Sequence, residues 1–73
     1  MFKKSKREME GSVKECQVYI HHKTGVEYIV IELIPLKLNG KWETAVVYES
    51  LEDGKLWSRP EENFVEKFEL IKP

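Results

Sequence analysis

Residues 45–68 read AVVYESLEDGKLWSRPEENFVEKF, and this segment holds two strand patterns, the turn between them and the start of a helix. Asp53-Gly54 is typical of a two-residue hairpin loop, and that loop would place Tyr48 opposite Arg59. Trp57 then lies on the same face as Tyr48, because alternate residues of a strand share a face. We therefore expect a hairpin whose second strand brings Trp57 into the core and Arg59 to its edge.

A helical turn and a last strand are expected after this hairpin. Pro60 biases the preceding residue toward extended backbone and suits the first position of a helix, so it ends the strand. Phe64 and Phe68 are four residues apart and would seal one end of the core. Residues 69–71 can then form a short final strand.

A second hairpin is predicted upstream at Asn39-Gly40, the strongest short hairpin signal in a sequence. A two-residue loop there pairs Leu38 with Lys41 and places Pro35 at a non-hydrogen-bonded position, where its missing N–H costs the ladder nothing. The core face predicted from this register comprises Ile29, Ile31, Leu33, Trp42, Val46 and Tyr48, with Ile31 opposite Tyr48.

The other face of this long hairpin is also apolar, and it carries Val30, Ile34, Ala45 and Val47. Three explanations are open: a bulge at Pro35, a bent strand covered on both faces as in small barrels, or a surface for self-association or protein contact. We favour the bent barrel. This apolar face is a second candidate site for contact with a protein.

The first strand is expected within residues 15–21, where Cys16, Val18 and Ile20 alternate with polar residues. Cys16 is therefore expected to be a buried, unreactive thiol. Together the patterns predict an all-β fold: a small SH3-like barrel of about five antiparallel strands, with a short helical turn before the last strand.

Residues 1–12 are predicted to be a flexible basic arm, and residues 13–73 a single small domain. Residues 1–14 hold five basic and two acidic residues, a balance of +3, so with −1 for the whole chain residues 15–73 carry −4. One cysteine allows no internal disulfide and favours the cytoplasm. No apolar run is long enough for a signal peptide or a membrane span.

The residues that usually carry chemistry do not converge in this sequence. His21 and His22 are adjacent in a strand and point to opposite faces, so they cannot readily share a metal ion. The carboxylates are scattered and the four glycines are isolated turn residues, so neither an acid–base pair nor a phosphate loop is expected. We expect no enzyme activity, no metal and no cofactor.

One group of residues is a candidate binding site because an arginine lies beside aromatic rings, where it can stack or bind a carboxylate or phosphate. The group comprises Tyr48, Trp57 and Arg59, joined by Tyr19, His22 and Tyr28. The structural alternative is that Trp57 fills the core and that Arg59 pairs with Glu61, Glu62 or a chain end.

The sequence resembles a family of bacterial and bacteriophage proteins, the domain of unknown function 1653. The resemblance is carried by Val46-Val47-Tyr48, by Leu56-Trp57-Ser58-Arg59-Pro60, by Phe64 and Glu66-Lys67, and by Tyr19, His22, Gly25, Tyr28 and Val30 in the opening segment. It spans about residues 17–69, and the longer hairpin around Asn39-Gly40 looks like the phage-type members. The resemblance implies a compact domain of bacterial or bacteriophage origin, but it implies no mechanism.

These observations lead us to expect a non-catalytic binding module, a phage or prophage accessory protein that contacts a host or phage protein. The alternative is a protein that binds single-stranded RNA or DNA through exposed aromatic rings and the basic arm, with Lys3, Lys4, Lys6 and Arg7 on phosphates. The acidic balance of residues 15–73 favours the protein partner. We expect a monomer or a weak homodimer, with no membrane contact.

Overall fold

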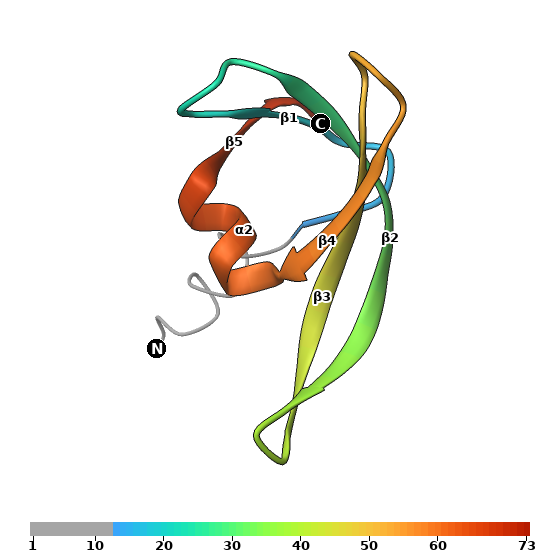
Figure 1. The fold of residues 1–73 in the computed structure, drawn as a ribbon, viewed down its shortest axis with the longest axis vertical. Coiled ribbons are helices and arrows are strands. Elements are labelled where there is room, and N and C mark those ends of the chain that lie inside the picture. The colour runs from blue at the N-terminus through green and yellow to red at the C-terminus, as the bar shows by residue number, and fades with distance from the viewer. Residues whose placement is uncertain (1–12) are drawn as a thin grey trace.

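The computed structural model describes residues 13–73, which form one antiparallel sheet and one helix (Figure 1). The predicted basic arm lies outside these residues. The elements are β1 (Val18–His21), β2 (Glu27–Leu38), β3 (Lys41–Ser50), β4 (Leu56–Pro60), α2 (Glu61–Lys67) and β5 (Phe68–Lys72). The strand order is β4-β3-β2-β1-β5, so the predicted all-β fold with five antiparallel strands and a helix before the last strand is confirmed.

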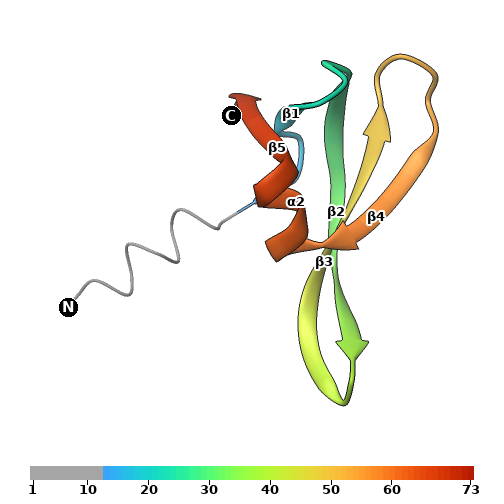
Figure 2. The same ribbon diagram turned by 60° about the vertical axis from the view of Figure 1, so that its left-hand side comes forward.

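The sheet curls without closing. Among the described residues the two edge strands, β4 and β5, do not pair with each other, so the SH3-like barrel is a loose one. Helix α2 joins these two strands directly in sequence and packs against β3, β4 and β5 (Figures 1 and 2). The helix therefore occupies the side on which the sheet stays open.

The Asn39-Gly40 turn forms as predicted. Both residues have positive φ, 50° and 78°, as a two-residue loop of this kind requires. Leu38 pairs with Lys41, and the predicted register is confirmed from this turn back to Glu32.

Beyond Glu32 the register shifts, because Ile31 is an extra residue in β2. Val30, not Ile31, is the partner of Tyr48. An extra residue reverses which side chains face the core. Val30 is consequently buried, at 1% exposed, whereas Ile31 is 41% exposed, so the prediction that Ile31 lies in the core was wrong. The bulge considered above exists, but at Ile31 and not at Pro35.

The second turn is longer than predicted. The partner of Tyr48 in β4 is Trp57, two positions away from the predicted Arg59. The cause is Ser50, whose hydroxyl accepts hydrogen bonds from the Glu52 and Asp53 amides at 3.1 and 3.3 Å and so closes a four-residue loop. A shift of two residues keeps the same side chains on the same face.

The core is built mainly from aromatic rings. Its buried residues are Val13, Tyr19, Val30, Val46, Tyr48, Phe64 and Phe68, with Tyr28 and Leu33 packed against them. Phe64 and Phe68, which were predicted to seal one end of the core, are both buried, and their rings stack with centroids 4.2 Å apart. Both tryptophans were wrongly predicted as core, since Trp42 is 68% and Trp57 51% exposed.

Trp42 is exposed because the β2–β3 hairpin is longer than the rest of the sheet. Among residues 13–73, β1 pairs with β2 only as far as Ile29, and β4 pairs with β3 only over Ala45–Glu49. The stretch from Glu32 to Thr44 is therefore a two-stranded ribbon that projects beyond the domain (Figures 1 and 2). Trp42 lies on this ribbon, opposite Lys37.

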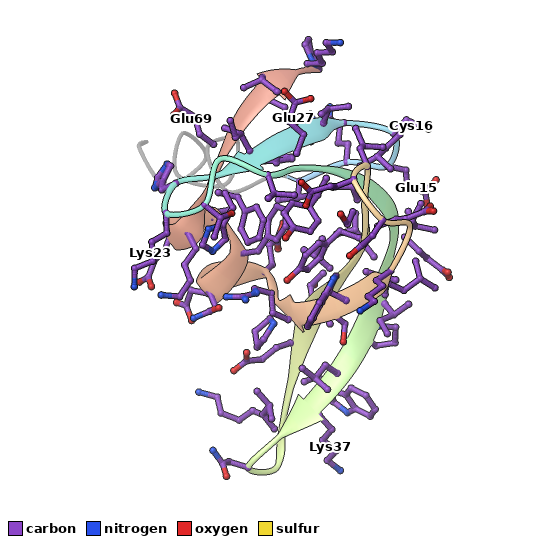
Figure 3. All side chains as sticks on the ribbon, turned by 45° about the horizontal axis from the view of Figure 1, so that its top comes forward. Glu15, Cys16, Lys23, Glu27, Lys37 and Glu69 are labelled. Carbon is purple, nitrogen blue, oxygen red and sulfur yellow. The ribbon has the colours of Figure 1, made fainter. Side chains whose placement is uncertain are left out.

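Cys16 also differs from its prediction. It precedes β1 in a turn, it is exposed, and its φ is 70° (Figure 3). Its amide donates a hydrogen bond to the Val30 carbonyl over 2.8 Å, which fixes the backbone in this conformation. Separately, no helix in the described part of the chain is long and apolar enough to cross a membrane.

Candidate functional site

The structure brings together Tyr48 and Arg59, two residues of the predicted constellation. The Arg59 Nε–H donates to the Tyr48 hydroxyl over 2.8 Å, and Nη1 donates to Asn63 Oδ1 over 2.6 Å. The guanidinium carbon lies 5.5 Å from the centroid of the Phe68 ring. Arg59 therefore links β4, β3, α2 and β5, and Asn63 is its partner where Glu61 or Glu62 was considered.

The other predicted site residues are distributed over the domain. Tyr19 is 6% exposed and packs edge-on against Phe64, with ring centroids 4.9 Å apart. Tyr28 is half-buried and packs edge-on against Tyr48 at 5.2 Å. Trp57, in β4, pairs with Tyr48 of β3 but is half exposed. The three tyrosines thus contribute to packing.

Burial favours the neutral form of two of these phenols. It raises the pKa of Tyr19, where the Glu61 carboxylate adds to the effect, and it raises the pKa of Tyr28. Both side chains therefore remain neutral near pH 7. The Tyr19 hydroxyl accordingly donates a hydrogen bond to Gln17 Oε1 over 3.0 Å.

The two histidines have separate environments. His22 is exposed, with Nε2 3.8 Å from a Glu69 oxygen. His21 Nδ1 accepts hydrogen bonds from the Lys23 and Thr24 amides at 3.2 and 3.3 Å, which holds the β1–β2 turn. Burial lowers the pKa of His21, and the Arg59 charge lowers it further. Within residues 13–73 no group of three or more His, Cys, Asp or Glu side chains is placed to hold a metal ion.

A groove lies where the projecting ribbon meets the start of α2, and we call it the hairpin groove. It is open to solvent and has a volume of about 620 Å³. Its lining residues are Leu33, Ile34, Pro35, Trp42, Glu43, Thr44 and Glu61. Sequence reasoning missed this groove, because it treated Trp42 as a core residue.

The indole of Trp42 is the largest exposed side chain of the hairpin groove. Lys37 Nζ lies 5.5 Å from the centre of its ring, close enough for a cation–π interaction. Figure 3 shows Lys37 near the far end of the ribbon, away from Lys23 and Glu69. One end of the groove is thus cationic and aromatic, and the other ends at the Glu61 carboxylate.

A ligand is more readily bound by the side chains of the hairpin groove than by the backbone at the outer edges of β2 and β4. Leu38–Lys41 and Leu36–Glu43 are the hydrogen-bonded pairs nearest the turn, and Pro35–Thr44 follows at a non-hydrogen-bonded position, so the Pro35 nitrogen points to the outer edge of β2. Pro60 occupies the corresponding outward position at the end of β4. Proline has no N–H to donate to an added strand. Recognition through side chains in the groove is therefore favoured over strand addition.

These features define a small, curved antiparallel-sheet domain with a largely aromatic core, a half-buried arginine beside that core and a projecting ribbon. The family model described as "Protein of unknown function (DUF1653)" matches residues 17–72. The chain therefore belongs to this family, as the sequence resemblance predicted, and the match extends from the residue before β1 to the end of β5. No curated protein and no solved structure matches the chain.

Proposed function

We propose that this domain is a non-catalytic binding module and that the hairpin groove is its contact surface for a partner protein. In this proposal the chain is a cytoplasmic phage or prophage accessory protein, and the partner is a host or phage protein. The observation that carries the proposal is Trp42, which is 68% exposed beside an open groove.

When a partner covers an exposed indole in a groove, the burial of apolar surface makes a large favourable contribution to the binding free energy. Covering about 100 Å² of apolar surface contributes about 2.5 kcal/mol. Tryptophan is also enriched among the few residues that dominate binding energy in interfaces. Leu33 and Pro35 extend the apolar surface, and Glu61 and Lys37 provide charges at its two ends.

The test is affinity capture with the purified full chain as bait, in wild-type, Trp42→Ala and Trp57→Ala forms. Both tryptophans are exposed, so both variants should fold, and they differ in whether the lost ring lines the groove. We expect a partner retained by the wild type and by Trp57→Ala to be lost with Trp42→Ala. Equal retention by all three forms would place binding elsewhere.

A second candidate function is binding of single-stranded nucleic acid, and the end of the ribbon favours it. Lys37 and Lys41 lie beside the turn, and Trp42 offers a ring on which a base could stack. In this alternative Lys3, Lys4, Lys6 and Arg7 add phosphate contacts. The overall balance of −4 over residues 15–73 opposes it, since phosphate contacts dominate such affinities.

Salt dependence separates the two candidates. If Lys37 and Lys41 contact phosphates, changing both to Gln should reduce the slope of log affinity against log salt by about 1.4 for a single-stranded oligonucleotide. Lys23→Gln provides the control, because Lys23 is exposed in the β1–β2 turn at the other end of β2. An unchanged slope would exclude the ribbon as the nucleic-acid contact.

A further inference from the structure

The described chain begins beside the hairpin groove. Val13 is 4% exposed and belongs to the core, and its amide donates a hydrogen bond to Glu61 Oε2 over 3.1 Å. The same Glu61 side chain lines the groove at the start of α2. Residues 1–12 are therefore attached to the domain at one wall of the hairpin groove.

The composition of residues 1–12 complements that groove. This segment has four basic residues, Lys3, Lys4, Lys6 and Arg7, against two glutamates, a balance of +2. The groove residues with acidic side chains are Glu43 and Glu61, and Glu62 follows in the first turn of α2. The segment also contains Met1, Phe2 and Met9, which match the apolar groove residues Leu33, Pro35 and Trp42.

The length of residues 1–12 and their covalent attachment beside the groove favour contact between this segment and the hairpin groove. Twelve extended residues span up to about 40 Å, and the longest dimension of the domain is 40 Å, so the segment can reach the whole ribbon. A short tether gives an effective concentration of about 1 mM, so an intrinsic dissociation constant of that size already gives half occupancy.

From this anchor, charge and reach we propose that residues 1–12 bind in the hairpin groove of their own chain. The basic side chains lie toward Glu61, and an apolar side chain covers Trp42. The segment thereby competes with any partner for the same surface. A second copy of the chain and a separate protein are the other occupants that the experiment must distinguish.

The test places a nitroxide spin label at position 5 of the full chain, using Ser5→Cys with Cys16→Ser, and records the ¹H–¹⁵N spectrum. We expect the Trp42 indole N–H and the Thr44 amide to lose several-fold more intensity than the Trp57 indole and the Thr24 amide. The effect should fade in 1 M NaCl, where the Debye length is about 3 Å. Equal losses at Trp42 and Trp57 would overturn the proposal.

Two matched variants locate the contact. Glu61→Gln keeps a side-chain oxygen that can accept the Val13 hydrogen bond but removes the charge, so it should weaken the loss at Trp42. Glu69→Gln removes a charge from an exposed residue in β5 and should leave the loss unchanged. The same response in both variants would contradict binding at Glu61.

A mixed sample identifies which chain supplies the segment. Spin-labelled chain without ¹⁵N is mixed with unlabelled ¹⁵N chain, and broadening at Trp42 in this mixture would show exchange between copies and overturn the intramolecular proposal. In a chain with native Cys16, changing Lys3, Lys4, Lys6 and Arg7 to Gln should shift the Trp42 indole signal but not that of Trp57. These measurements involve no partner, so their outcome is separate from that of the proposed function.

Discussion

The Arg59 Nε–H donates to the Tyr48 hydroxyl over 2.8 Å, and this contact joins edge strand β4 to its neighbour β3. The same guanidinium reaches Asn63 in α2 and lies near the ring of Phe68 in β5. Among the described residues the two edge strands share no ladder, so side chains must hold them together. Arg59 is the polar component of that closure, and stacked Phe64 and Phe68 are the apolar component.

Removing the Tyr48 hydroxyl should therefore destabilise the fold. Tyr48→Phe keeps the ring in the core but leaves Arg59 without an acceptor for Nε, which costs about 1.5–3 kcal/mol for a bond to a charged group. Urea unfolding should show the loss. Trp57→Phe is the control and should stay within about 0.5 kcal/mol, because Trp57 is half exposed. Equal stability of Tyr48→Phe and the wild type would exclude this role of Arg59.

The aromatic residues should differ sharply in their effect on stability. Phe64 is fully buried, and Phe64→Ala should cost about 3–5 kcal/mol. A domain of this size has only about 3–5 kcal/mol in total, so this variant should be largely unfolded by circular dichroism. Trp42→Ala should unfold at nearly the wild-type urea concentration. A strongly destabilised Trp42→Ala would mean that the tryptophan is a core residue after all.

His21 should make stability depend on pH. Its folded-state pKa is lowered from the ordinary 6.5, so the unfolded chain binds the proton more readily. The His21 contribution is therefore complete above pH 6.5 and is lost as the pH falls from 6.5 to the folded-state pKa. The physical event is that a protonated Nδ1 no longer accepts from the Lys23 and Thr24 amides.

The measurement is the free energy of unfolding at a series of pH values between 7 and 5. His21→Asn supplies an acceptor that does not titrate and should flatten the profile in this range. Parallel profiles for the wild type and His21→Asn would assign the pH dependence to other groups.

Position 16 should prefer glycine over larger residues. Cys16 has a φ of 70°, a left-handed conformation that costs a residue with a Cβ about 1–2 kcal/mol. Cys16→Gly should be at least as stable as the wild type, because relief of this strain offsets the added freedom of the unfolded chain. Cys16→Val should be less stable, since a β-branched side chain tolerates this conformation poorly. Thermal unfolding of the pair tests the point, and the reverse order of melting temperatures would contradict it.

Sequence information was sufficient where one local signal dominated. Asn39-Gly40 fixed both its turn and the adjacent pairing, and Pro60 marked the boundary between β4 and α2. Sequence information was insufficient where the pairing depended on a bulge or a side-chain hydrogen bond that no motif marks. Ile31 follows Val30 without any glycine or proline, so nothing marked the bulge that puts Val30 into the core. The Asp53-Gly54 loop lengthened because Ser50 captured two amides, a side-chain effect that a turn motif does not encode.

The candidate site was predictable in part for the same reason. The proximity of Tyr48 and Arg59 survived an error of two positions in register, because such a shift keeps both residues on one face. The hairpin groove was not predictable, since it depends on where β1 and β4 stop along the longer β2 and β3. Strand alternation put Trp42 on the core face but could not show that the domain ends before reaching it.

Pro35 and Pro60 have a consequence for behaviour at high concentration. The unpaired edges of a two-stranded ribbon can template the addition of strands from identical chains, which leads to fibrils. Pro35 removes a donor from the β2 edge of the ribbon, and Pro60 removes one from the outer edge of β4, so an incoming strand would lack a hydrogen-bond donor at each of these positions. The outer edges of β2 and β4 are thus poorly suited to polymerisation by strand addition, although the ribbon itself is exposed.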